Sequence, residues 1–209
     1  SLVGSEMCIR DSSSTPTIIR SILLCVWIAG MFVVLVLVLK SSLQLRSLKR
    51  SALPLQNTTI CKLYKQCLFE MKITRNIPIY STAFLKTPII TGIFKTRIYM
   101  PIHLISDHQK TDVRYILLHE LQHYKHKDSL ANYLMFLTAI LYWFNPIVWY
   151  ALKEMRNDRE IACDTSVLKM LDECDYEKYG NTLINFAETI ALSPFPLTMG
   201  ISGNIKQLK

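Results

Sequence analysis

The sequence predicts a mainly helical protein that is anchored in a membrane and carries a small β-hairpin or sheet. Half of its 209 residues are hydrophobic and its mean hydropathy is +0.22, which is too apolar for an average soluble domain. An uncharged run over residues 21–39 is long enough to cross a bilayer. After this run the residue pattern predicts helices, and only two short segments are typical of strands. We therefore expect one transmembrane helix followed by one modest globular domain.

The transmembrane helix is expected over residues 21–39. At ~1.5 Å per residue this run covers roughly 28 Å, close to the ~30 Å hydrocarbon core of a bilayer. A buried core helix is the alternative, but the run is apolar on all sides. A cleaved signal peptide fits less well, because the run is too long and no small-residue cleavage site follows it. Basic residues are concentrated within residues 40–50, so the positive-inside rule places everything after Lys40 in the cytoplasm.

The charge and the cysteine content limit the possible binding partners of the chain and the cellular compartment it occupies. The net charge of +8 could suggest nucleic acid, but no zinc finger, basic heptad or RNA-binding motif accompanies it. The basic residues cluster beside the apolar run instead, so we expect contact with anionic lipid headgroups and no direct nucleic-acid binding. The six cysteines are scattered without a CxxC pair, which predicts free thiols in a reducing compartment.

The sequence divides into further segments along the chain. Residues 1–12 resemble a translated sequencing adapter, so we expect them to be non-native. Residues 40–209 are expected to form the cytoplasmic domain. Within that domain, residues 133–152 form a second uncharged stretch, which Asn145 and Pro146 should break.

The domain is expected to combine helices with two short strands. The strands are predicted at residues 77–82 and 97–100, and Gly92 between them allows a turn. The strand at 97–100 is a candidate sheet edge beside a cleft, where an extended peptide substrate could add as a further strand. A plain structural hairpin is an equally good interpretation. Helices are predicted over residues 58–72, from Asp112 past His123, over 147–171 and over 175–192.

His119, Glu120 and His123 form the pattern with the clearest chemical meaning. Two histidines four residues apart lie on one face of a helix, about 6 Å apart along its axis, where one metal ion can bridge them. Glu120 is rotated by ~100° from His119, where a general base must sit to take a proton from a metal-bound water. The pattern therefore predicts Zn²⁺ and peptide hydrolysis. An ordinary amphipathic helix with surface histidines is the alternative.

A zinc peptidase also needs a third protein ligand and an open position for water. Glu160 is the better candidate, because it shares a helix face with Asp164, which could hold a ligand imidazole by a hydrogen bond. A solvated charged helix face is the alternative for this pair. His126 is disfavoured, because it lies ~10.5 Å further along the helix axis than His119. The candidates for stabilising the oxyanion are Arg156, Arg159 and Tyr124.

Residues 133–152 decide whether Glu160 can share a metal with the two histidines. If this stretch crossed the bilayer once, Glu160 and His119 would face opposite compartments, and twenty residues are too few to cross twice. The alternatives are that Glu160 is not a ligand, that the stretch dips in and returns, or that it packs as a core hairpin. We expect a re-entrant or interfacial hairpin that holds the domain against the membrane.

With these residues in place, the chain resembles the membrane-bound BlaR/MecR-type regulatory metallopeptidases, the beta-lactam sensor-transducer and antirepressor family. The resemblance covers about residues 21–209. It is carried by the strand segment of residues 88–101, the helix segment 115–123, the aromatic Asn-Pro segment 142–146 with Trp149, and the ExxxD motif of residues 160–164.

The resemblance implies a gluzincin-like fold in which His119, His123 and Glu160 bind zinc and Glu120 acts as the base. It also implies that an extracellular signal activates proteolysis at a cytoplasmic active site. A cytoplasmic transcriptional repressor is then inactivated, which permits expression of antibiotic-resistance genes, and self-cleavage accompanies activation. Family members are multi-pass proteins with further transmembrane helices, and many carry an extracellular sensor domain. A homodimer is a candidate assembly.

Two other functions compete with this one. A housekeeping membrane protease of the CAAX-prenyl-protease or HtpX-like type would share HExxH and ExxxD, but the aromatic Asn-Pro segment favours the first interpretation. A non-catalytic membrane receptor or scaffold with incidental histidines is the other alternative. A zinc measurement on purified protein separates this last alternative from both enzymes.

Overall fold

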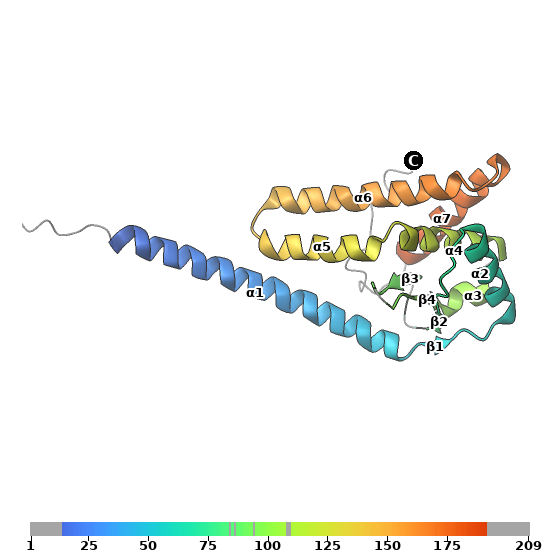
Figure 1. The fold of residues 1–209 in the computed structure, drawn as a ribbon, viewed down its shortest axis with the longest axis horizontal. Coiled ribbons are helices and arrows are strands. Elements are labelled where there is room, and N and C mark those ends of the chain that lie inside the picture. The colour runs from blue at the N-terminus through green and yellow to red at the C-terminus, as the bar shows by residue number, and fades with distance from the viewer. Residues whose placement is uncertain (1–13, 84, 86, 94, 108–109, 192–209) are drawn as a thin grey trace, which may run out of the picture.

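The computed structural model describes residues 14–83, 85, 87–93, 95–107 and 110–191, and the mainly helical fold with a small sheet is as expected. One long helix leads into a body of helices and strands, and a pair of helices extends from that body along the long helix (Figure 1). The segment 1–12 that we expect to be non-native lies outside the described residues, as does the end of the expected domain, residues 192–209.

The long helix α1 spans Ser14–Arg50 and contains the predicted membrane segment. Its part from Thr17 to Leu43 is long and apolar enough to cross a membrane. The helix continues beyond this part because no glycine or proline interrupts residues 31–50. Its last turn carries Lys49 and Arg50, whose positive charges suit a helix C-terminus. The Lys49 ammonium lies 5.9 Å from the ring centroid of Tyr99, which connects the end of α1 to the sheet.

The sheet is mixed, with the order β1-β2-β4-β3. Its strands are β1 (Leu53–Pro54), β2 (Ile79–Thr82), β3 (Ile89–Thr91) and β4 (Arg97–Pro101). The two strands that we predicted, β2 and β4, are neighbours and run parallel. They are parallel because the chain first returns through β3, which forms an antiparallel hairpin with β4. Gly92 allows the turn of this hairpin, with a φ of +101° that favours glycine.

Of the two interpretations of residues 97–100, a sheet edge and a plain structural hairpin, the structure contradicts the first and agrees with the second. Strand β4 lies between β2 and β3, and it forms a hairpin with β3. The edges of the described sheet are β1 and β3, and β3 is the edge strand that contacts the helix carrying the two histidines. A three-residue strand such as β3 gives too short an apolar pattern to be recognised on its own.

The helix with the two histidines, α4 (Lys110–Lys125), is the centre of the body. It contacts α2 (Thr58–Glu70), β3, α7 (Tyr176–Ala191) and the pair formed by α5 (Asp128–Leu141) and α6 (Pro146–Leu168). Five of its apolar residues are almost completely buried: Val113, Ile116, Leu117, Leu118 and Leu121. Burial on several sides fixes the rotation of α4, and therefore the direction in which its histidines point.

The start of α4 differs from the prediction. The helix begins at Lys110, after the short helix α3 (Ile102–Asp107), which the sequence did not predict. Asp112 therefore lies inside the first turn and does not cap the helix. Its carboxylate accepts a hydrogen bond of 3.2 Å from the Thr182 hydroxyl, which ties α4 to α7.

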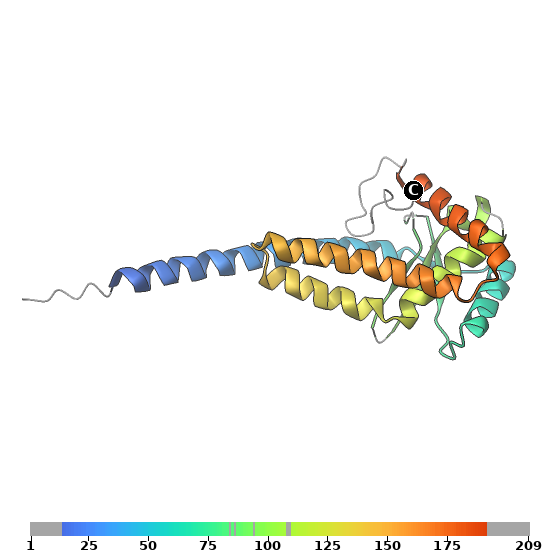
Figure 2. The same ribbon diagram turned by 90° about the horizontal axis from the view of Figure 1, so that it is seen from above.

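The second uncharged stretch, residues 133–152, forms the end of helix α5 (Asp128–Leu141), a turn and the start of helix α6 (Pro146–Leu168). They lie side by side and antiparallel (Figures 1 and 2), so the chain turns back at residues 142–145. Asn145 caps α6 by accepting a hydrogen bond from the Ile147 N–H, and Pro146 occupies the first helical position. The interface of the two helices buries Met135, Ala139 and Leu152, with Val148 packed against them.

The chain then passes through a short 3-10 helix, Glu173–Asp175, into α7. The five cysteines within the described residues are free thiols, and Cys8 lies outside them.

Candidate metal centre

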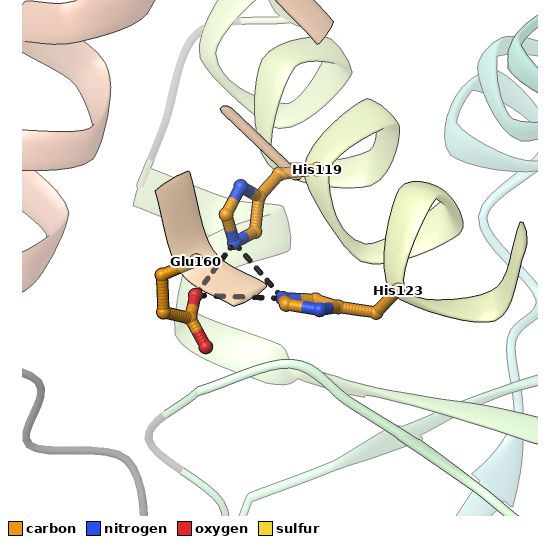
Figure 3. A group of neighbouring side chains, drawn as sticks. All are labelled: His119, His123 and Glu160. Carbon is orange, nitrogen blue, oxygen red and sulfur yellow. Dashed lines mark hydrogen bonds and ion pairs between the residues drawn. The ribbon is translucent and has the colours of Figure 1, made fainter. Parts of the chain in front are cut away.

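Three of the predicted residues converge at the face that α4 turns toward α6. His119 and His123 point from successive turns of α4, and Glu160 reaches them from α6 (Figure 3). The two imidazole Nε2 atoms are 3.1 Å apart, and each lies 3.6 Å from the Glu160 Oε2 atom. Two unprotonated imidazole nitrogens at this distance repel each other unless a proton or a cation lies between them.

The spacing of these three atoms fits one tetrahedral metal ion. Zinc binds histidine nitrogen and carboxylate oxygen at ~2.0–2.2 Å, so two ligand atoms at the tetrahedral angle lie about 3.3–3.6 Å apart. The observed 3.1, 3.6 and 3.6 Å agree with this value to within a few tenths of an ångström. Two histidines and one carboxylate are also a donor set that zinc prefers. The residues present therefore fit the ion that the sequence predicted.

Asp164 and Tyr179 hold the imidazole of His119 at its Nδ1 atom, on the side opposite the metal position. The His119 Nδ1 atom lies 3.0 Å from the Asp164 Oδ1 atom and 3.2 Å from the Tyr179 hydroxyl. The Tyr179 hydroxyl also donates a 2.7 Å hydrogen bond to Asp164. A proton held on Nδ1 leaves the lone pair of Nε2 directed at the metal position. Asp164 thus has the contact that its spacing from Glu160 suggested, whereas no sequence pattern pointed to Tyr179.

Asp128 has the equivalent role at the imidazole of His123. Its carboxylate lies 2.6 Å from the His123 Nδ1 atom, and its side chain is only 10% exposed. Arg159 fixes the backbone here, because its guanidinium donates to the Asp128 carbonyl oxygen at 3.3 Å and to the Asn132 side chain at 2.9 Å. Sequence reasoning missed Asp128, and the only available signal was a carboxylate at the start of the helix after the histidine pair.

The electrostatics of the site favour a bound cation. Burial alone would lower the pKa of His119, but hydrogen bonds to Asp164 and Glu160 raise it to about 10. Burial tends to raise the pKa of Glu160, yet its hydrogen bond to His119 and the nearby His123 hold that pKa below its usual range. The carboxylates of Asp164 and Glu160 attract a positive charge to this site, which either a proton on an imidazole or a metal ion can supply.

Glu120 lies beside this group on α4 and is half-buried. Burial raises the pKa of its carboxyl, against the lowering effect of His123 and His119. A raised pKa brings a carboxylate closer to the working range of a general base at neutral pH.

The remaining predicted residues are placed differently. His126 stays outside the group, with its Nε2 atom 3.0 Å from the Gln122 amide nitrogen. Tyr124 packs against the hydrophobic core. Arg159 is committed to the start of α5, as described above. Of the three candidates for oxyanion stabilisation, Arg156 is the one that shares a helix face with Glu160, one turn away.

A second group of ligand-type atoms, His123, Asp128 and Cys163, overlaps the first. Burial and the adjacent Asp128 carboxylate raise the pKa of the Cys163 thiol, which donates to Asp128 at 3.7 Å. Asp128 and Cys163 both lie at the His123 Nδ1 atom, at 2.6 and 3.2 Å, so they support this imidazole on the side opposite the Nε2 atom that faces His119 and Glu160.

Comparison with known proteins decides the family. The model of the family described as BlaR1 peptidase M56 matches residues 9–208, almost the whole chain. The chain belongs to this family. It is 36% identical to the regulatory protein BlaR1 of Bacillus licheniformis over 181 residues, which are 87% of this chain and 30% of the relative. It is 26% identical to the methicillin resistance mecR1 protein of Staphylococcus aureus over an alignment of 212 positions, which covers 99% of this chain and 36% of the relative.

Membership of the M56 family confirms the resemblance drawn from the sequence. The chain spans about a third of the length of these curated relatives. The family is one of metallopeptidases, and the described residues contain a group fit to bind a metal. The membrane-length helix α1 and the regulatory relatives together indicate a membrane protein. The family match favours the regulatory interpretation over a CAAX-prenyl-protease or HtpX-like housekeeping protease.

Proposed function

We propose that this chain is the catalytic part of a membrane-bound zinc metalloendopeptidase that acts in signal transduction. The observation that carries the proposal is the triangle of His119, His123 and Glu160 atoms, 3.1–3.6 Å apart. Carboxylates from Asp164 and Asp128 support both imidazoles from behind. Incidental histidines on a helix surface have no reason to carry such support, which argues against a non-catalytic scaffold.

The chemistry follows from the residues around this triangle. Zinc bound there would act as a Lewis acid and make a water molecule acidic enough to ionise near neutral pH. Glu120 would take the proton from the attacking water and pass it to the amine that leaves the peptide. Arg156, one helical turn from Glu160 on α6, is the candidate cation for the negative charge that would develop on the carbonyl oxygen.

The edge strand β3 is the site that we propose for binding the substrate. It contacts α4, and its partner β4 covers only one of its two edges within the described sheet. An extended peptide added along β3 would satisfy its own backbone groups and lie beside the metal centre. This assigns to β3 the role that the sequence had suggested for residues 97–100.

The expected setting is the cytoplasmic side of the cell membrane. The basic end of α1 favours a cytoplasmic body, and the relatives are named as a regulatory protein and as a methicillin resistance protein. We propose a multi-pass full-length protein whose substrate is a cytoplasmic transcriptional repressor, with a homodimer as the candidate assembly. Lipid contact is expected at α1 and at the α5–α6 pair.

Two substitutions test the proposal on the purified chain in detergent, with self-cleavage and cleavage of a candidate repressor as readouts. Glu120→Gln is expected to retain near-stoichiometric zinc but to lose cleavage. Glu160→Ala is expected to lose zinc, whereas Glu154→Ala on the same helix serves as the matched control and keeps both. Cleavage retained in Glu120→Gln contradicts the mechanism. Absence of zinc from the wild-type chain supports the non-catalytic alternative.

A further inference from the structure

The closed end of the α5–α6 hairpin is attached to the middle of the membrane-length helix. The Trp27 indole N–H of α1 donates to the Leu141 carbonyl oxygen at 3.1 Å. In return, the Trp143 indole N–H donates to the Trp27 carbonyl oxygen at 3.3 Å. Gly30 makes this contact possible, because a Cβ atom there would collide with the indole ring of Trp143. Residue 30 is the midpoint of the part of α1 that can cross a membrane, Thr17–Leu43.

Four of the five carbonyl groups of residues 141–145 at this end accept hydrogen bonds from the protein itself. The Leu141 carbonyl accepts from Trp27, and the Trp143 carbonyl accepts from the Trp149 indole at 2.8 Å. The Tyr142 carbonyl accepts from the Asn145 N–H, and the Asn145 carbonyl accepts from the Trp149 N–H. A turn in water needs no such partners, because water binds its carbonyl groups. In hydrocarbon, each carbonyl group without a partner costs several kcal/mol.

The outer surface of the hairpin is apolar, and large parts of it are exposed among the described residues. No charged residue occurs between Asp128 and Lys153. Large side chains on both helices are about half exposed or more, among them Leu134, Leu137, Phe144, Ile147 and Tyr150. A continuous apolar surface of this kind is rare on soluble proteins.

The length of the hairpin matches one half of a bilayer. The fourteen residues of α5 cover about 21 Å, and half of a ~40–45 Å membrane, headgroups included, measures about the same. Asp128 would then lie at the water boundary when the tip lies at the centre. The first charged residue of α6, Lys153, lies about 11 Å from Pro146 along the helix, within reach of the headgroups for a long side chain.

We propose that the α5–α6 hairpin enters a single leaflet, stops at the bilayer midplane and docks there on Gly30 of α1. The occupant of its exposed surface is lipid acyl chain. This goes beyond the re-entrant or interfacial hairpin predicted from the sequence, because it fixes the depth of the tip and its partner.

Tryptophan fluorescence tests the depth directly, because all three tryptophans of the chain lie at this contact. The Trp27→Phe variant keeps only the two hairpin tryptophans as reporters and still offers the carbonyl that accepts from Trp143. The full chain is reconstituted into phosphatidylcholine and phosphatidylglycerol vesicles that carry bromine at the 6,7 or at the 11,12 positions of the acyl chains. We expect at least twofold stronger quenching by the deep bromines. Equal or stronger quenching by the shallow bromines means an interfacial hairpin and overturns the proposal.

A pair of glycine variants tests the docking. Gly30→Ala in the Trp27→Phe background places a Cβ against the Trp143 ring and should reduce the ratio of deep to shallow quenching. Gly180→Ala is the matched control, because a Cβ there meets nothing within 4 Å. An unchanged ratio in Gly30→Ala overturns the docking on α1. Neither measurement depends on zinc or on a substrate, so its failure is distinct from failure of the proposed peptidase activity.

Discussion

The Asp128→Ala substitution is expected to weaken zinc binding without removing any of the three proposed ligands. The carboxylate lies 2.6 Å from the His123 Nδ1 atom and is 10% exposed, so water neither screens this contact nor replaces it easily. Losing the partner behind a metal-binding histidine typically lowers metal affinity by about 10–100-fold, or roughly 1.4–2.7 kcal/mol. The short distance and the burial lead us to expect the upper part of that range.

Competition with a chromophoric zinc chelator at pH 7 measures this effect on the purified chain. Asp128→Asn should fall between wild type and Asp128→Ala, because its amide oxygen can still accept from Nδ1 but carries no negative charge. Asp172→Asn, an exposed carboxylate on the loop before α7, is the control and should bind zinc as wild type does. A zinc affinity in Asp128→Ala within twofold of wild type would refute the supporting role assigned to Asp128.

Three further outcomes are expected. Tyr179→Phe removes the hydroxyl behind the first histidine and should lower zinc affinity several-fold in the same titration, whereas the exposed Tyr176→Phe should not. Zinc at 100 times its Kd should stabilise the folded chain by about 2.7 kcal/mol, seen as a higher Tm that a chelator reverses, and Glu160→Ala should abolish this difference. Leu121→Ala, at a fully buried core position, should lower the free energy of unfolding by about 2–5 kcal/mol. Phe69→Ala, at a largely exposed position, should change that free energy by about 0.5 kcal/mol or less, and thermal unfolding in detergent compares the two.

Local signals in the sequence were sufficient to predict the helices α1, α2, α4, α6 and α7, and to select His119, His123 and Glu160 as the candidate metal ligands. The i, i+4 spacing of the histidines places both on one face whatever the rest of the chain does. The prediction of a turn at Asn145–Pro146 was equally local, since a cap and a proline at the first helical position need no tertiary contact. These features were therefore predictable from residues alone.

The sheet and the supporting residues depended on contacts between distant segments. Whether β2 and β4 run parallel depends on the path through β3, which is too short to give a pattern of its own. Tyr179 lies 60 positions after His119 in the sequence, and it contacts this histidine only because α7 packs against α4. Arg159 was a plausible oxyanion partner by proximity to Glu160, but the packing of α6 on α5 directs its guanidinium to Asn132. Spacing could not reveal these directions.

The hairpin explains how Glu160 reaches histidines 41 and 37 positions away. Asp128 and Arg159 are equally distant in sequence from the middle of the turn at residues 142–145, and Arg159 does contact the Asp128 backbone. Because the two helices are antiparallel, Arg159 of α6 lies beside Asp128 of α5, and Asp128 in turn contacts His123. Glu160 is the residue after Arg159, so it also lies close to His123. A single crossing of the bilayer by residues 133–152 would instead separate Glu160 from His123 by a membrane thickness of ~30 Å. The 3.6 Å between their side-chain atoms is therefore incompatible with a single crossing, and it requires that the stretch turn back on the side from which it started.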